Sequence, residues 1–317
     1  MDNAQMLTEV SKKIDVGGQA VIEGVMMRAP KSMTIAVRKP DGQIFTKEDV
    51  WHSISERIPF LKIPFFRGSV AILEALINGI QALTFSANQA VDEEDTPMGG
   101  WAMFFTISLS LGLALFLFVA VPHLLSALLT QLLGEETGVE SFLFHLIDGI
   151  LKIIIFVSYV WLISLSKEIR RVFEYHGAEH KSIYTYEAGE SLSVENARKY
   201  STLHPRCGTA FILIVLIMSI LFFSVVFPFV PKLAGLPTIL KQAIYIGFKI
   251  LLMFPIAGVA YEILKFSSKR LTNPFVHTLI LPGLWMQKLT TREPSDDQLE
   301  VALAALDRAI QIHNQAS

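Results

Sequence analysis

Four long apolar stretches constrain the fold of this chain more than any other feature. They lie at about 102–123, 142–165, 209–230 and 243–264. At 1.5 Å per residue, each is long enough to cross a hydrocarbon core of about 30 Å as a helix. Of the 317 residues, 52% are hydrophobic and only 18% are charged, a balance typical of a membrane protein with a modest soluble portion. The sequence therefore predicts a mainly α-helical integral membrane protein with four transmembrane helices.

The distribution of lysine and arginine predicts how the chain is oriented. Ten of these residues precede the first stretch, seven lie between Lys167 and Arg206, and six follow from Lys265 onward. The connection 134–140 carries three glutamates and neither lysine nor arginine. Because cytoplasmic loops carry the positive excess, both termini and the polar loop 167–208 are expected in the cytoplasm. The polar start of the chain lacks the apolar core of a signal peptide, which agrees with this orientation.

Net charge and cysteine content narrow the class of protein further. The formal net charge of −2 argues against nucleic-acid binding, which needs a concentrated basic excess. The single cysteine, Cys207, excludes an internal disulfide and suits a reducing compartment. This thiol is therefore either an inert buried group or a chemically used one.

Residues 1–100 predict a small cytoplasmic α+β region. Ser32–Arg38 and Gln43–Lys47 flank a Lys39–Gly42 turn, which is typical of a β-hairpin. The preceding segment Gly17–Pro30 is interpreted as another strand with a glycine turn. The hairpin is expected to be followed by an amphipathic helix.

This helix is expected over residues 63–91, where Glu74, Asn78 and Gln81 recur at helical spacing. It lies either in the membrane interface or within the helix bundle. We favour the interface, because these three polar side chains are costly in lipid.

The chain is expected to continue with a four-span region, 101–266, and a C-terminal region, 267–317. Leu271–Leu289 mixes apolar residues with prolines and suits an interfacial segment. A last helix is expected from Ser295, which forms a capping-box pattern with Gln298. Its apolar face is predicted to dock on the cytoplasmic portion.

Four sequence motifs resemble those of a known family. They are Gly17–Pro30, H-G-A-E-H-K at His176–Lys181, H-P-R-C-G-T at His204–Thr209, and Leu289–Ala302. Together they resemble the YqhQ-type family of bacterial multi-pass membrane proteins, described as a domain of unknown function, and the likeness extends over nearly the whole chain. The resemblance implies a bacterial cell membrane location, contact with the lipid bilayer and a predicted metal-dependent enzyme, and it names no substrate.

The segment from His176 to His180 fits H-x-x-E-H, the arrangement of the inverzincin metallopeptidases. Two histidines one helical turn apart can bind one ion from the same face of a helix. Glu179 lies beside them, where it could take a proton from a metal-activated water. His176 and His180 are thus candidate metal ligands, and Glu179 is the candidate catalytic base.

His204 and Cys207 extend this ligand pool a short distance downstream. If all four nitrogen and sulfur ligands bind, they complete a closed tetrahedral site, which is normally structural. If His176 and His180 bind with only one of the two, a position stays open for catalysis. Glu262 is a further candidate ligand, although pairing with an interfacial lysine or arginine explains it better.

A second constellation lies inside the predicted spans. His145, Asp148 and Lys152 share one face of the second stretch, and Lys249 of the fourth falls at a comparable depth. Charged side chains in a membrane are expensive and usually paired, so an ion pair between Asp148 and the two lysines is the favoured interpretation. The alternative is an ion or proton path.

These observations support functions from different classes. The first is a metal-dependent hydrolase at the cytoplasmic face, with zinc or another divalent ion. The alternative is a non-enzymatic channel, transporter or membrane-protein assembly factor in which the metal is structural. Other membrane proteins or a second copy of the chain would then be partners. A third hypothesis is that the histidines bind no metal.

Overall fold

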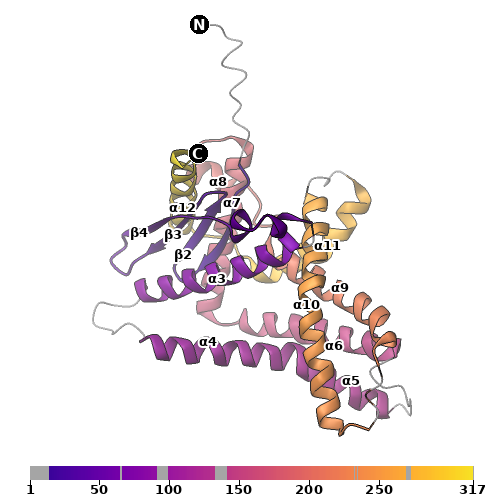
Figure 1. Cartoon of the computed structure of the whole chain (residues 1–317). Helices are drawn as coiled ribbons and strands as arrows, with labels where there is room; N and C mark the ends of the chain where they lie inside the picture. The colour runs from indigo at the N-terminus through magenta and orange to yellow at the C-terminus, as the bar shows by residue number, and fades with distance from the viewer. Residues whose placement is uncertain are drawn as a thin grey trace.

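The chain folds into a set of long apolar helices joined to a four-stranded sheet that has helices on both faces (Figure 1). The computed structural model describes residues 14–64, 66–90, 99–132, 141–231, 233, 235–268 and 273–316. The polar start of the chain up to residue 13 and the acidic connection 134–140, both used above to orient the chain, lie outside the described residues.

The sheet is antiparallel, with its strands in chain order. Its members are β1 (Gly17–Val21), β2 (Gly24–Ala29), β3 (Ser32–Arg38) and β4 (Ile44–Val50). The predicted hairpin is confirmed as β3 and β4. The expectation of one further strand is corrected to two, because Glu23 turns the chain with a φ of 51°. Gly24 then runs so close to β3 that a Cβ there would lie 2.1 Å from the Ala36 carbonyl oxygen, so this position requires glycine.

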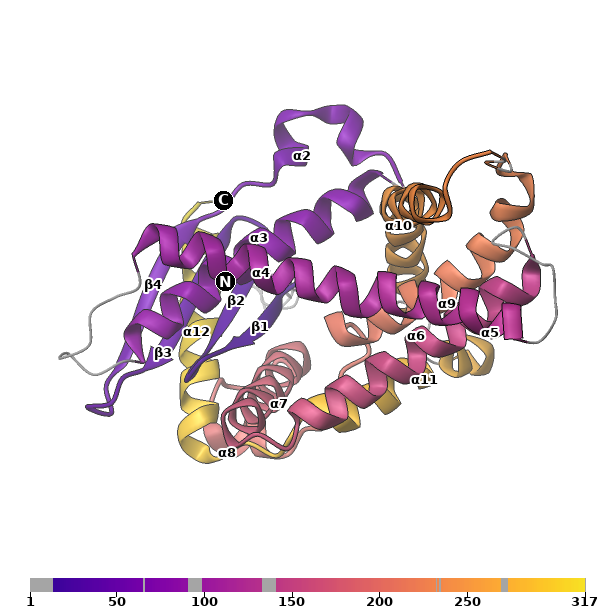
Figure 2. The same cartoon turned by 90° about the horizontal axis from the view of Figure 1, so that it is seen from below.

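Helices cover both faces of the sheet. On one face, Val25 and Met27 pack against α7 (Lys167–Ala188) and α12 (Asp296–Gln315). On the other face, Met26 and Ile35 form a cluster with Ala82 of α3 (Phe66–Gln89). Figure 2 shows α3 and α7 on opposite sides of the strands. Successive side chains of a strand point to opposite faces, so burial of both faces explains why β2 and β3 are apolar at most positions.

Helix α12 confirms the C-terminal prediction. The Ser295 side chain accepts a hydrogen bond from the Gln298 N–H, and the Gln298 side chain accepts one from the Ser295 N–H at 2.9 Å. This capping box satisfies N–H groups that a helix start leaves open. Leu299 and Leu306 are buried against the sheet side. The C-terminus of the chain is therefore part of the same core as the N-terminal strands.

Within the described residues, five helices, rather than the four predicted, are long and apolar enough to cross a membrane. They are α3, the continuous helix Gly100–Leu132 (α4 Gly100–Leu115, a π-helical turn η2 at Phe116–Ala120, and α5 Val121–Leu132), α6 (Phe142–Ile163), α9 (Gly208–Val226) with the 3-10 turn η3 (Phe227–Phe229), and α10 (Thr238–Ser268).

The additional candidate span is α3, the helix predicted to be amphipathic. Glu74 and Asn78 of this helix are only 5% and 7% exposed, because both face protein. Leu76 and Ile77, in contrast, are exposed. Two of the three polar side chains that argued against a span are therefore hidden from lipid, whereas Gln81 is exposed. The preference for an interfacial position of α3 stays a prediction.

The remaining helical segments are α2 (Ile54–Arg57), η1 (Pro59–Lys62), α8 (Val194–Arg198) and α11 (Pro274–Thr290). Helix α11 corresponds to the segment predicted to be interfacial, and it packs mainly against α9. Helix α7 is not a straight continuation of α6. The chain turns between them at Ser164–Ser166, and Ser166 caps the start of α7. This turn directs α7 toward the sheet.

Candidate metal centre

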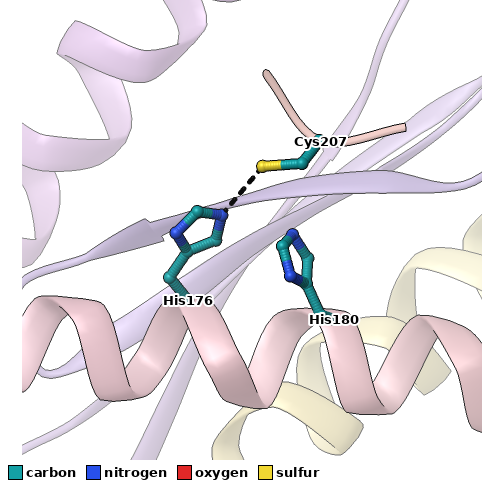
Figure 3. Close-up of side chains that lie close together, drawn as sticks. All are labelled: His176, His180 and Cys207. Carbon is teal, nitrogen blue, oxygen red and sulfur yellow. Dashed lines mark hydrogen bonds between the residues drawn. The ribbon is translucent and has the colours of Figure 1, made fainter. Parts of the chain in front are cut away.

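Helix α7 places two imidazoles side by side on one face. His176 and His180 are four residues apart, and their ring centroids are 4.5 Å apart (Figure 3). The helix starts at the Ser166 cap and ends at Gly189, whose φ of 78° is the left-handed conformation that glycine adopts readily. Both histidines lie well inside this capped helix, so the backbone fixes their spacing.

A close backbone approach fixes the position of α7 against the segment that follows α11. A Cβ on Gly177 would lie 2.1 Å from the Arg292 carbonyl oxygen, so glycine is required for this contact. The Arg292 N–H also donates to the Phe173 carbonyl at 2.9 Å. This contact places the Thr290 carbonyl within reach of His176.

Backbone carbonyls orient both imidazoles in the same way. His176 Nδ1 lies 2.8 Å from the Thr290 carbonyl oxygen, and His180 Nδ1 lies 2.5 Å from the Thr202 carbonyl oxygen. A carbonyl only accepts, so Nδ1 carries the proton in each ring and the Nε2 lone pair is available. Metal-binding histidines commonly show this pattern, with the far nitrogen donating to a carbonyl or carboxylate.

Cys207 approaches the two rings from the start of α9. It is the N-cap of that helix, and its Sγ accepts a hydrogen bond from the Thr209 N–H at 3.4 Å. The same sulfur lies 3.1 Å from His176 Nε2, the contact drawn as a dashed line in Figure 3. One ligand atom from each of His176, His180 and Cys207 lies within 4.8 Å of the others. Three donor atoms therefore converge on one point.

The ligand atoms of this cluster are buried, so any of them that lacks a hydrogen-bond partner is energetically costly. His180 is 1% exposed and Cys207 is 6% exposed. His180 Nε2 has no hydrogen-bond partner among the residues that the structure describes. Burial lowers the pKa of His180, so its imidazole is neutral near pH 7. A neutral imidazole with an unsatisfied lone pair is the form that binds a metal, and the donor set therefore fits a zinc-type ion.

His204, the fourth predicted ligand, lies beside these three residues, but its ring contacts Glu187 and Tyr184. Its Nε2 is 3.5 Å from Glu187 Oε2, and its ring packs against Tyr184. The ring centroids of His180 and His204 are 5.6 Å apart. Burial lowers the pKa of His204 to about 4. The structure thus brings together His176, His180 and Cys207, one of the two three-ligand sets considered from the sequence.

Glu179, the candidate base, is buried between α7 and β1. Its side chain is so close to the strand that a Cβ on Gly18 would lie 2.9 Å from Glu179 Cγ. Burial raises the pKa of the Glu179 carboxyl, while nearby His176 and His204 and the Gly18 N–H lower it. The carboxyl is therefore a buried proton acceptor within electrostatic reach of His176 and His204.

Glu262 does not take part in this cluster. Its carboxylate forms two hydrogen bonds with Arg67, at 2.6 Å and 2.5 Å. The favoured interpretation of Glu262, pairing with a lysine or arginine, is confirmed, and the interfacial position of the pair stays a prediction. The bidentate pair joins α3 to α10.

The intramembrane constellation is a second buried polar group. Asp148 Oδ2 accepts hydrogen bonds from Lys152 Nζ at 2.8 Å and from Lys249 Nζ at 2.7 Å. The predicted ion pair is therefore confirmed. Lys249 also contacts His123 Nδ1 at 3.0 Å, and His123 Nε2 contacts Gln242 Oε1 at 2.6 Å. We refer to His123, Asp148, Lys152 and Lys249 as the intramembrane cluster.

Sequence reasoning missed several members of the two groups. His123 was placed at the end of the first stretch, whereas the helix continues to Leu132 and carries it inside. The polar residues after it, such as Ser126 and Thr130, mask this continuation in a simple count of apolar residues. The Thr202 carbonyl belongs to a loop and the Thr290 carbonyl to the last residue of α11, and no sequence pattern marks either of them.

Comparison with known proteins identifies a family whose members resemble this chain. Residues 63–312 match the family described as "Protein of unknown function (DUF1385)". The chain is also 32% identical over 316 residues to a Bacillus subtilis (strain 168) protein named "Uncharacterized protein YqhQ", covering 93% of this chain and 92% of that one. No solved structure matches. The matched family region contains the candidate metal ligands and the intramembrane cluster.

Proposed function

This chain belongs to the DUF1385 family, as its motifs indicated, and from the geometry of its buried site we propose that it is a membrane-embedded metal-dependent hydrolase. His176, His180 and Cys207 would hold a zinc-type ion. The observation that carries the proposal is the convergence of their three ligand atoms within 4.8 Å, with both Nδ1 atoms held by backbone carbonyls.

The type and number of ligands favour zinc and a reactive site. Two imidazoles and one thiolate are ligands that zinc binds readily, and catalytic zinc sites use three protein ligands with one position left open. When bound, such an ion acts as a Lewis acid that lowers the pKa of a coordinated water.

In the proposed reaction, Glu179 receives the proton that water loses when it attacks the substrate. Its burial raises its proton affinity, and the Gly18 N–H holds the carboxyl in place. His204 lies within electrostatic reach of the same carboxyl. The two carbonyls keep His176 and His180 in one tautomer, so both Nε2 atoms stay available throughout.

A structural metal site is the second candidate, and a specific observation favours it. Solvent hardly reaches three of the candidate ligands, His180, His204 and Cys207. The ring centroid of His204 lies 5.6 Å from that of His180. Rotation of His204 toward His180 would close the site with a fourth ligand. A metal there would tie α7 to the start of α9 in a non-enzymatic membrane protein.

Metal analysis of the purified full-length protein tests both candidates. We expect about one zinc ion per chain in the wild type, and almost none in the H176A/H180A double variant. H52A, which changes an exposed histidine, should keep the metal. A wild-type protein without stoichiometric metal would overturn the proposal.

Two further variants separate a reactive site from a structural one. H204A should keep its zinc if three ligands bind, and lose it if His204 completes a closed site. E179Q should keep its zinc in either case, and should lose the ability to hydrolyse any substrate that the wild type cleaves. Hydrolysis by E179Q at the wild-type rate would exclude Glu179 as the base.

A further inference from the structure

A polar cavity lies on the opposite side of β1 from the candidate metal centre. It is open to solvent, has a volume of about 460 Å³ and is lined by residues of β1, β2 and α3 and by Tyr261 of α10. Figure 2 shows α3 crossing the sheet next to α10. The polar side chains that line it are Gln19, Arg28, Asn78, Arg206 and Tyr261, together with the surface residue Asp15.

Two of these side chains present hydrogen-bond donors that no described residue accepts. Asn78 is 7% exposed, and its Nδ2 is buried without a partner in the described part of the chain. Arg28 stacks on the Trp51 ring at 3.5 Å, and its nearest carboxylate oxygen, on Glu74, is 3.8 Å away. That distance is too long for a hydrogen bond, so the Arg28 guanidinium, which lies over Trp51 near Glu74, keeps N–H groups that this ion pair does not satisfy.

The acidic groups nearest to Arg28 and Arg206 are already engaged. Glu74 Oε1 accepts hydrogen bonds from Ser53 Oγ at 2.8 Å and from the Ile54 N–H at 2.7 Å. Asp15 pairs with Arg206 at 3.3 Å, and Arg206 also pairs with Glu187. Glu74 Oε1 and one oxygen of Asp15 are thus engaged, whereas Asn78 Nδ2 has no partner in the described part of the chain and Arg28 makes only the long ion pair with Glu74. A ligand that fits must bring acceptor oxygens.

The position of the cavity indicates which oxyanion reaches it. Two of its walls are α3 and α10, both long and apolar enough to span a membrane. Ala71 and Ala75 of α3 leave room beside the polar groups, and Leu76 and Ile77 are exposed on the same helix. An apolar tail can therefore lie along α3 while an anionic head enters the cavity.

We propose that this cavity binds the phosphate headgroup of an anionic phospholipid, with Arg28 and Asn78 as the two donors to its oxygens. Arginine is well suited to phosphate, because its planar group donates two parallel hydrogen bonds. Basic pockets at the edge of membrane helices hold lipid headgroups in the same way. The site is separate from the metal ligands, and its occupation does not depend on the proposed hydrolase.

Ligand-dependent thermal stability of the delipidated full-length protein in mild detergent tests this site. Short-chain phosphatidylglycerol should raise the unfolding temperature in a saturable way. Glycerol 3-phosphate and inorganic phosphate at the same concentration are the probes for a soluble source. A similar effect of these two would assign the cavity to a soluble phosphate and overturn the lipid assignment.

Two variants with matched controls locate the effect. N78D keeps the shape of the side chain, removes the open donor and adds a negative charge, so the apparent Kd for phosphatidylglycerol should rise at least about tenfold. R28Q should weaken binding by a similar factor. N88D, on the exposed side of the same helix, and R170Q, on α7, should bind as the wild type does. Unchanged binding in N78D and R28Q, or no lipid effect on the wild type, would overturn the proposal.

Discussion

The two buried polar groups of this protein solve the same physical problem in different ways. In the intramembrane cluster, both lysines donate to one carboxylate oxygen and His123 joins Lys249 to Gln242. Only Asp148 Oδ1 has no hydrogen-bond partner among these four side chains. In the candidate metal centre, by contrast, lone pairs of His176, His180 and Cys207 face one another with at most one thiol proton between them.

The difference indicates what each group does. Donors and acceptors of the intramembrane cluster offset the cost of burying charge among themselves, which is the behaviour of a structural ion pair. The single Cys207 thiol proton serves His176 Nε2, which leaves the buried lone pair of His180 Nε2 without a partner among the described residues. The intramembrane cluster satisfies its own charges, which favours a structural role. The candidate metal centre leaves a ligand atom unsatisfied, which favours a role in binding.

Removal of the charge on Asp148 gives the largest expected effect. D148N should lower the free energy of unfolding by about 3–5 kcal/mol, because two ammonium groups would remain buried without a carboxylate. K249M should cost less, since Asp148 keeps Lys152. Denaturant unfolding in detergent micelles measures both. D148N should also keep its zinc, which tests whether the two groups are independent.

The outcome that would break the comparison is a D148N protein as stable as the wild type. The intramembrane cluster would then not be a structural pair. Changed ion flux through D148N in proteoliposomes, with stability unaltered, would instead favour the ion or proton path considered from the sequence.

A smaller effect is expected where α7 contacts the segment after α11. G177A should lower the free energy of unfolding by about 1–3 kcal/mol, because its Cβ would collide with the Arg292 carbonyl and force α7 to move. The same movement would displace His176 from the Thr290 carbonyl, so zinc content should fall as well. G112A is the matched control, since a Cβ at this α4 glycine meets open space.

Replacement of the Cys207 sulfur tests whether this residue is a metal ligand, and it should change stability little. C207S keeps a side chain that caps α9, so the unfolding free energy should change by less than about 1 kcal/mol. Zinc affinity should nevertheless drop, because a hydroxyl is a poor substitute for a thiolate. Cobalt substitution measures this directly through the sulfur-to-metal absorption band. The same band in C207S and wild type would exclude Cys207 as a ligand.

Periodicity and the cost of burying charge were enough to predict part of both polar groups from the sequence. Helical spacing placed His176 beside His180, and the expense of charge in lipid paired Asp148 with Lys152 and Lys249. The sequence could not choose between His204 and Cys207, because that choice depends on the path of a loop. The fifth candidate span, α3, was missed for a related reason. Glu74 and Asn78 are hidden by tertiary contacts that no local pattern reveals.

The smallest expected effect concerns Glu179 in the metal-free protein. Because burial raises the folded pKa of its carboxyl above the ordinary value of 4.5, the folded state holds its proton to higher pH than the unfolded state. Wild-type stability should therefore fall as pH rises from 4.5 through the folded pKa. E179Q has no charge to bury, so it should lack this decline and be at least as stable as the wild type near pH 7. Unfolding curves across this pH range, with chelator present, measure the difference. A wild-type profile as flat as that of E179Q would mean that water or a partner already compensates the carboxylate, and the contrast between an incomplete metal centre and a complete ion pair would weaken.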